Sequence, residues 1–226
     1  EPEGRRTVAD LLREQGLKAR VYPVGRLDWD ADGLLLLTDD GELANRVMHP
    51  SNHLPKLYSV KVRGVPDSRD LDKVRRGVMI EPGVRTLPAD VEIEGVADDN
   101  TWLRITLQEG RQNQIKRMFE LVGHPVRRIR RLAIGPLRLG RMKVGDIRPL
   151  TDEELRRLRR DLDRAAEGDT VKPARQERRQ AGNRRPPAPR VRRRPAAGPE
   201  AAFQGAAAAR RRPVGTPRTR RRAART

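Results

Sequence analysis

The residue patterns predict an α+β fold with a mixed, mainly antiparallel sheet, followed by a long disordered tail. Stretches that alternate apolar and polar residues, as half-buried strands do, are interspersed with stretches of helical spacing. Short turn-rich connections join neighbouring strand segments, as in hairpins. The third observation is a change of composition near residue 168, where the sequence turns to Arg, Pro, Ala and Gly.

The individual elements follow from these spacings in chain order. Val8, Leu11 and Leu12 share one face of a short first helix, which a glycine ends. A capping box that begins at Thr151 opens the last helix. The sequence predicts helices over 7–15, 42–48, 70–76, 115–122 and 151–162, and strands over 21–27, 34–37, 57–63, 89–94, 101–107 and 126–139.

The chain is expected to form one folded domain over residues 1–167 and a basic tail over residues 168–226. The first part contains 32 Lys and Arg against 28 Asp and Glu, a net charge of +4, and the second contains 18 against 3, a net charge of +15, which together give +19. The tail has one aromatic residue, Phe203. It cannot bury enough apolar surface to offset the entropy of ordering, so we expect it to be disordered.

Arginine runs in this tail point to a polyanionic partner. Three consecutive arginines begin at each of Arg192, Arg210 and Arg220. Such runs attract polyphosphate by releasing its condensed counterions, a sequence-independent contribution that weakens as salt rises. A tail that only increases solubility is the alternative.

Composition excludes several classes of protein. The chain has no cysteine, which rules out disulfides, thiolate metal sites and cysteine nucleophiles. Its longest apolar run, residues 33–37, is far shorter than the roughly 20 residues that span a bilayer, and no signal-peptide pattern opens the chain. We therefore expect a cytoplasmic, monomeric enzyme or RNA-binding protein that does not associate with a membrane and binds no metal or cofactor.

The acidic stretch that begins at Asp28 has the pattern D-x-D-x-D-G and imitates a calcium-binding loop. An EF-hand needs a helix leading into that loop, and Pro23 and Gly25 break one there. Asp39 stands at the twelfth position, where a bidentate Glu is needed. The histidines offer no better metal site, so we expect none.

The functional prediction depends on three short motifs that follow one another along the chain. They are Gly25-Arg26-Leu27-Asp28 with Gly33-Leu34-Leu35-Leu36-Leu37-Thr38 and Asp40-Gly41; then Lys56-Leu57-Tyr58-Ser59-Val60; then Glu109-Gly110-Arg111 through Gln114-Ile115-Lys116-Arg117-Met118. In residue types, order and spacing they resemble the motifs of the bacterial ribosomal RNA pseudouridine synthases of the RsuA/RluB type. The resemblance covers about residues 2–155 and implies the catalytic-domain fold of that family.

The resemblance implies isomerisation of a specific uridine of ribosomal RNA to pseudouridine, with Asp28 as the catalytic carboxylate and Tyr58 as the active-site tyrosine. Uracil must be detached from its nitrogen link, held, turned and rejoined through ring carbon 5. One carboxylate suffices, either by attacking the anomeric carbon or by removing a ribose proton, and both routes stay open. A base that leaves its stack is held by an aromatic ring, for which Tyr58 is the candidate. No cofactor or metal is needed.

The same resemblance implies roles for basic and polar residues. Lys116 is expected to pair with Asp28 and keep its carboxylate ionised, although the family more often has Arg there, whose bidentate fork a Lys lacks. Arg26 is similar to the Arg that helps displace the target base. Outside the three motifs, an Arg beside an Asp would more often be a surface ion pair. The remaining expected RNA contacts are Arg111, Gln114 and Arg117.

Two questions stay open at this point. Family members usually begin with a small RNA-binding domain and a first strand of the catalytic domain; neither is visible, so we expect an N-terminal truncation and a sheet that lacks a strand. An RNA-binding or ribosome-assembly protein without catalysis is the alternative to the enzyme. In either case the partner is ribosomal RNA or a pre-ribosomal particle, and the motifs and tail favour the large subunit over the small one.

Removal of residues 168–226 should weaken RNA binding and flatten its salt dependence, while the modified position stays the same. The reason is that phosphate contacts position a protein on RNA and carry little sequence information. Binding titrations at several salt concentrations measure the slope. An unchanged slope would show that the tail does not bind RNA.

Overall fold

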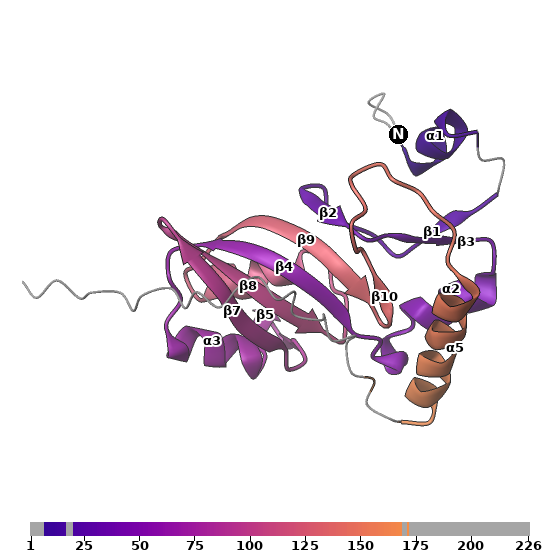
Figure 1. Ribbon diagram of the computed structural model, residues 1–226. Helices are drawn as coiled ribbons and strands as arrows, with labels where there is room; N and C mark the ends of the chain where they lie inside the picture. The colour runs from indigo at the N-terminus through magenta and orange to yellow at the C-terminus, as the bar shows by residue number, and fades with distance from the viewer. Residues whose placement is uncertain (1–6, 17–19, 169–170, 172–226) are drawn as a thin grey trace, which may run out of the picture. The chain divides into compact units, whose positions relative to one another are not determined.

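The computed structural model describes residues 7–16, 20–168 and 171 (Figure 1). The chain divides into two units, residues 1–177 and 178–226, and all the described residues belong to the first. The predicted tail lies outside the described residues except for Gly168 and Val171, and so do the first residues, on which the expected truncation rests. The domain boundary after residue 167 therefore stays a prediction.

The described residues form five α-helices, ten strands and one short 3₁₀ helix. In chain order these are α1 (Val8–Glu14), β1 (Tyr22–Val24), β2 (Ala31–Gly33), β3 (Leu36–Thr38), α2 (Gly41–Met48), η1 (Pro50–Asn52), β4 (Lys56–Arg63), α3 (Ser68–Arg75), β5 (Met79–Glu81), β6 (Val84–Arg85), β7 (Asp90–Ala97), β8 (Asn100–Leu107), α4 (Gln114–Leu121), β9 (Val126–Ile134), β10 (Leu137–Arg138) and α5 (Asp152–Ala166). The predicted α+β class with mainly antiparallel pairing is confirmed.

The main sheet has the strand order β10-β9-β4-β8-β7, and every neighbouring pair in this path is antiparallel. Strand β2 lies outside this path and pairs with β9 in the parallel direction, with Ala31 opposite Ile129 and Gly33 opposite Arg131. Figure 1 shows β4, β9, β8 and β7 as one twisted layer, with α3 lying along it. The parallel pair fixes the acidic stretch of the sequence against the sheet.

One hydrophobic core lies between this sheet and the helices α3 and α4. The prediction that residues 58, 60 and 62 share a face of β4 is confirmed, because Val60 and Val62 are buried in this core and Tyr58 packs against it. Alternation along β4 thus packs the partly buried Tyr58 against the core. The other buried members are Leu71, Val74, Ala89, Val91, Leu103, Ile105, Leu107, Ile115, Met118, Phe119 and Ile129.

A second core joins α2 and α5 to the strands β1, β3 and β10. Figure 1 shows α2 and α5 beside each other, and an ion pair between Arg46 and Asp163 links them. Val171 is buried in this core, so the chain just after α5 still contributes to it. A truncation that tests the tail should therefore begin at residue 172. The other buried members are Val24, Leu36, Leu43, Ala44, Val47, Leu54, Ile134, Leu137, Leu158, Leu162 and Ala165.

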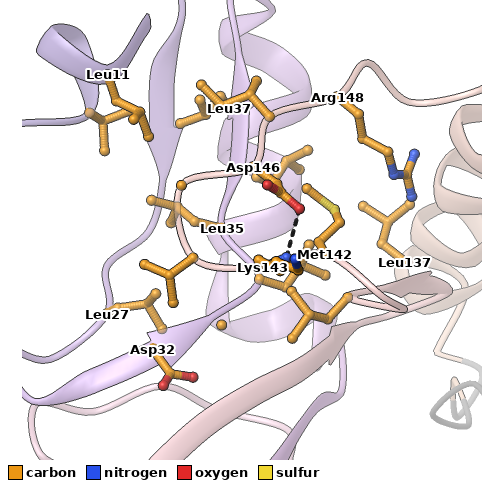
Figure 2. Close-up of a pocket in the computed structure, with 18 of the residues that line it drawn as sticks. Leu11, Leu27, Asp32, Leu35, Leu37, Leu137, Met142, Lys143, Asp146 and Arg148 are labelled. Atoms are coloured by element: carbon orange, nitrogen blue, oxygen red, sulfur yellow. Dashed lines mark hydrogen bonds between the residues drawn. The ribbon is translucent and has the colours of Figure 1, made fainter. Parts of the chain in front are cut away.

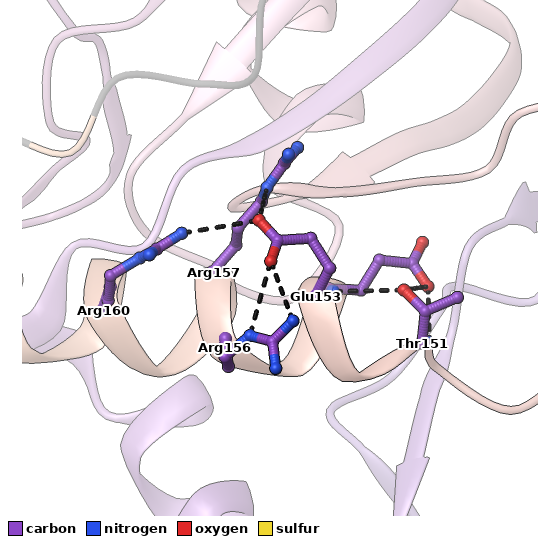
Figure 3. Close-up of polar contacts among 6 residues, drawn as sticks. Thr151, Glu153, Arg156, Arg157 and Arg160 are labelled. Atoms are coloured by element: carbon purple, nitrogen blue, oxygen red, sulfur yellow. Dashed lines mark hydrogen bonds and ion pairs between the residues drawn. The ribbon is translucent and has the colours of Figure 1, made fainter.

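The capping box predicted at the start of α5 is confirmed. Thr151 Oγ1 accepts a hydrogen bond from the backbone of Glu154, and the Glu154 carboxylate accepts one from the backbone of Thr151. The exposed face of the same helix carries a cluster of arginines, shown in Figure 3, whose shared partner is the Glu153 carboxylate. The arginines that pair with it are Arg156, Arg157 and Arg160.

Three elements differ from the sequence prediction. Strand β2 lies between the strands predicted over 21–27 and 34–37, where none was predicted, because its three residues become a strand only by pairing with β9. The strand predicted over 126–139 is divided into β9 and β10 by a turn at Gly135, whose φ of +51° a glycine tolerates. The β5–β6 hairpin was not predicted, since each strand is too short to show alternation. None of the helices in the described part of the chain is long and apolar enough to span a membrane.

Gly33→Ala should lower the free energy of unfolding by about 1–3 kcal/mol. Gly33 has φ +120°, and a Cβ there would lie 2.3 Å from the backbone oxygen of Arg131, so the β2–β9 pair must open. Denaturant unfolding measures the loss. Gly95→Ala is the matched control, because Gly95 lies in β7 with nothing within 4 Å of its Cβ position and without a positive φ. Equal stability of the two variants would contradict the prediction.

Candidate active site

Asp28 lies half-buried in the loop between β1 and β2. Gly25 turns the chain out of β1 with φ +81°, a conformation that few other residues adopt. The backbone N–H of Ala31 then donates to the Asp28 carbonyl at 2.9 Å and closes a tight turn. Strand β2 begins directly after this turn, so the β2–β9 pair determines where Asp28 lies.

A pocket of about 390 Å³ opens beside this loop. Asp28 and Tyr58 both line it. Lys116 and Arg117 do not belong to its wall; Arg117 instead pairs with Glu81 of β5. The structure therefore brings most of the predicted site residues to one pocket, and the predicted RNA contacts among them are Arg26, Arg111 and Gln114.

A larger pocket of about 730 Å³ lies elsewhere, among α1, the apolar run that contains β3, and the loop before α5 (Figure 2). Leucine is the commonest residue of its wall, and the Asp146 carboxylate there accepts a hydrogen bond from the Lys143 backbone at 2.7 Å. None of the predicted catalytic or RNA-contact residues lines it. The chemistry that the motifs imply therefore concerns the smaller pocket.

Tyr58 faces the smaller pocket from β4, opposite Arg131 of β9. Burial raises the pKa of the Tyr58 hydroxyl, the charge of the adjacent Arg131 and its hydrogen bonding to the hydroxyl oppose this increase, and the negative charge of Asp28 adds to it. The net pKa lies above the usual value, so the hydroxyl is protonated at neutral pH. Its half-buried ring offers a fixed surface on which a base can stack.

The part of the pocket wall that follows β8 is built around a buried carboxylate. Glu109, 9% exposed, accepts hydrogen bonds from the backbone of Leu87 at 2.8 Å, from the Gln114 amide at 2.7 Å and from Arg111 Nε at 3.0 Å. These three donors are the reason that a carboxylate can be buried here. Gln114 is itself 3% exposed, and its amide oxygen accepts from the Arg111 backbone. Its bonds in this structure hold the wall together, and its contact with RNA stays a prediction.

The expected pair between Lys116 and Asp28 is not observed. The Lys116 ammonium donates to Asp30 and, at 3.3 Å, to the side chain of Asn113. The hydrogen bond from Lys116 holds the pKa of Asp30 below its usual value. The turn that closes on Ala31 separates the two carboxylates: Asp28 lines the pocket, whereas Asp30 lies outside it with 59% of its side chain exposed.

The third carboxylate of the acidic stretch, Asp32, points to β9. It pairs with Arg130 and, at 3.1 Å, with Arg128. Burial opposes its ionisation, but these hydrogen bonds hold its pKa below the usual value. Asp28, Asp30 and Asp32 thus have separate surroundings, and no cluster of three or more His, Asp or Glu within the described ranges is placed to hold a metal ion.

Comparison with known proteins gives the family of the chain. The family described as RNA pseudouridylate synthase matches residues 2–121, which contain all three motifs and make up more than half of the chain. The chain belongs to the RNA pseudouridylate synthase family. Its α+β fold also matches the "Crystal structure of pseudouridylate synthase" with a TM-score of 0.56 and 34% identity, over 62% of this chain and 60% of that one.

Two bacterial relatives in this family show how much of the protein is matched. An "Uncharacterized RNA pseudouridine synthase" of Aquifex aeolicus is 43% identical over 157 residues, or 70% of this chain and 62% of that protein. The "Ribosomal large subunit pseudouridine synthase B" of Bacillus subtilis is 41% identical over 159 residues, or 70% of this chain and 64% of that protein. The match therefore spans less than two thirds of the length of either relative.

Two residues of the smaller pocket were not predicted as site residues from the sequence. Arg131 is 4% exposed, and Lys56 is largely buried beside it. Burial, together with the Arg131 charge, lowers the pKa of Lys56 to about 8. Lys56 belongs to the second motif, in which only Tyr58 was predicted to act at the site. Lys56 could have been noticed as a charged residue that leads into the apolar face of β4, whereas no local pattern distinguishes Arg131 from the other arginines of β9.

Lys56→Met should make the folded protein more stable at pH 7, by up to about 3 kcal/mol. Below pH 8 the folded protein holds a buried positive charge, which lowers its free energy of unfolding. This loss of stability disappears as the pH rises from about 8, the pKa of Lys56 in the folded protein, to 10.5, its pKa in the unfolded chain. The parent should therefore approach the variant in stability as pH rises through this window. Denaturant unfolding across pH measures the difference.

The matched control is Lys73→Met, because the Lys73 side chain is 57% exposed on α3. This variant should follow the pH dependence of the parent. A constant difference between Lys56→Met and the parent from pH 7 to 10.5 would contradict the assigned burial of the charge.

Proposed function

We propose that this chain isomerises a uridine of ribosomal RNA to pseudouridine, with large-subunit RNA as the favoured substrate. One observation carries the proposal: the half-buried Asp28 and the Tyr58 ring line the same pocket although they come from different motifs. The pocket is also rich in basic side chains, as an RNA substrate requires. The name of the Bacillus subtilis relative supports the choice of the large subunit.

Asp28 performs the central step. The target nucleotide leaves its stack and places its base against Tyr58, which brings the ribose to the carboxylate. Asp28 then attacks the anomeric carbon or removes a ribose proton, and the glycosidic bond breaks. The detached uracil turns and rejoins through carbon 5, whose proton must leave. Tyr58 stands beside the pocket as a candidate for that last transfer.

The remaining predicted residues act on the RNA chain. Arg26 and Arg111 are exposed on the pocket wall, where they reach phosphates. The pair of Lys116 with Asp30 is exposed, so it contributes about 1 kcal/mol at most. Incoming RNA can therefore displace Asp30 and leave Lys116 to pair with a phosphate or with Asp28. Lys116 keeps its proposed role as the cationic partner on this basis.

The proposal extends to the setting of the reaction. The chain acts as a cytoplasmic monomer on ribosomal RNA or a pre-ribosomal particle, without a metal or other cofactor. The chemistry supports the last point, because detaching and rejoining uracil transfers no electrons to a third molecule.

Asp28→Asn should reduce single-turnover formation of pseudouridine by about 10²–10⁴-fold or more while RNA affinity stays close to that of the parent. The change keeps the shape of the side chain and removes its nucleophilic or basic oxygen. Asp30→Asn is the matched control two residues away, and it should retain most of the activity because Asp30 lies outside the pocket. Chemical mapping of pseudouridine in ribosomal RNA incubated with each purified protein gives the rates and the position.

Two results would overturn this proposal. Activity of Asp28→Asn near that of the parent would remove Asp28 from the reaction. Tight, salt-sensitive binding of ribosomal RNA by the parent without any pseudouridine formed would favour the alternative, an RNA-binding protein that takes part in ribosome assembly.

A further inference from the structure

Two cations lie buried beside each other in the candidate pocket. Lys56 of β4 and Arg131 of β9 both line it, and the positive charge of Arg131 helps to lower the pKa of Lys56. Within the part of the chain that the structure describes, neither forms an ion pair with a carboxylate. Buried like charges are unfavourable unless an anion joins them. The arrangement therefore fits a negatively charged ligand.

Two backbone carbonyls hold the Arg131 guanidinium, and one of its nitrogens has no partner. Its Nε donates to the Leu34 carbonyl at 2.7 Å, and its Nη1 donates to the Arg26 carbonyl at 3.2 Å. These two acceptors lie on either side of Asp28 in the chain, so the guanidinium is fixed to both ends of the Asp28 loop. Its Nη2 is buried and has no hydrogen-bond partner. A fixed, unpaired donor is ready for an acceptor on a ligand.

The acids of the pocket wall leave this donor available. Glu109 is already bonded to Leu87, Gln114 and Arg111. Asp28 lines the pocket without an ion pair among the described residues, and the proposed reaction uses its oxygen at the ribose. Lys56 Nζ makes one long hydrogen bond, 3.3 Å, to the Leu54 carbonyl and keeps further donor capacity.

The proposed reaction creates an anion in this pocket. When the bond between the anomeric carbon and ring nitrogen 1 breaks, both electrons stay on the nitrogen, and the negative charge of the uracil spreads to its carbonyl oxygens. The charge is consumed when carbon 5 forms the new bond to the anomeric carbon. A proton then leaves carbon 5 and another reaches nitrogen 1, so the product is an isomer of the substrate.

We propose that Arg131 Nη2 and Lys56 Nζ bind a carbonyl oxygen of the target uracil and stabilise its negative charge while the base is detached. This inference rests on the proposed function and names the groups that hold the leaving base. Arg131 thereby links two tasks, because the guanidinium that fixes the Asp28 loop also contacts the base that Asp28 sets free.

A binding experiment tests the site without catalysis. The probe is free 5-fluorouracil, whose fluorine makes its N–H more acidic than that of uracil and whose fluorine NMR shift reports ionisation. The parent protein, below pH 8 so that Lys56 is charged, should lower the pKa of the bound base relative to the free base. Arg131→Met and Lys56→Met should each reduce that shift. Arg128→Met is the control, since Arg128 lies on the same strand outside the pocket and pairs with Asp32.

Three results of this experiment would overturn the inference. They are an absence of binding at millimolar 5-fluorouracil, a bound base that ionises at the same pH as the free base, and displacement of the base by inorganic phosphate at lower concentration. The last result would assign the cations to an RNA phosphate.

A kinetic experiment tests the same contact during the reaction. Arg131→Met should slow single-turnover conversion of a uridine RNA by about 10²–10³-fold, the usual effect of removing one donor to a developing anion. The reduction in rate should be smaller for RNA with 5-fluorouridine at the target, because fluorine already stabilises the leaving anion. For that RNA the rate is measured as the disappearance of the nitrogen-linked nucleoside. Arg131→Lys, which keeps a charge, should fall between Arg131→Met and the parent.

The two substrates separate a contact with the base from a structural role. A residue that only holds the Asp28 loop slows both RNAs by the same factor, and equal losses would overturn the inference. If Arg131→Met does not fold, as judged by thermal unfolding, the comparison is made with Lys56→Met. If the parent binds ionised 5-fluorouracil but forms no pseudouridine, the proposed function fails and the site for an anionic pyrimidine stands.

Discussion

The parallel pair of β2 with β9 holds the Asp28 loop in place, and the pocket is built around that loop. Backbone bonds join the two strands, and the Leu34 backbone N–H continues the contact by donating to the Arg131 carbonyl at 2.9 Å. In addition, the Arg131 side chain donates a hydrogen bond to the Leu34 carbonyl. Gly33 sits so close to the Arg131 backbone that a side chain has no room. One short strand therefore connects the first motif to the sheet that carries Tyr58.

This pairing also separates three carboxylates that the sequence places together. Asp32 lies within β2 and meets the arginines of β9. Asp30, in the preceding turn, meets Lys116 of α4 outside the pocket. Asp28 alone lines the pocket. A calcium ion requires such oxygens to converge, whereas a single catalytic carboxylate requires its neighbours to be neutralised elsewhere.

Burial in the pocket favours reactivity over stability. Lys56 and Arg131 hold positive charges in partly desolvated positions without a carboxylate partner. Burial of these two charges costs folding free energy that the two hydrophobic cores supply. Glu109 shows the contrasting case, because three donors satisfy it and its role is to hold the wall. Unsatisfied charge is thus concentrated where a substrate is expected.

The sequence by itself determined the α+β class, most of the helices, the apolar face of β4 and the three motifs that identify the family. These features depend on local spacing: the capping box at Thr151 involves residues three apart, and Val60 and Val62 are buried because strands alternate. Only the tertiary structure decided that Ala31–Gly33 form a strand, that Lys116 contacts Asp30 rather than Asp28, and that Arg131 is buried beside Tyr58. Each of these contacts joins residues far apart in the chain, such as the 86 positions between Lys116 and Asp30. Their partners are chosen by packing and by the direction of the β2–β9 pair, which no local pattern records.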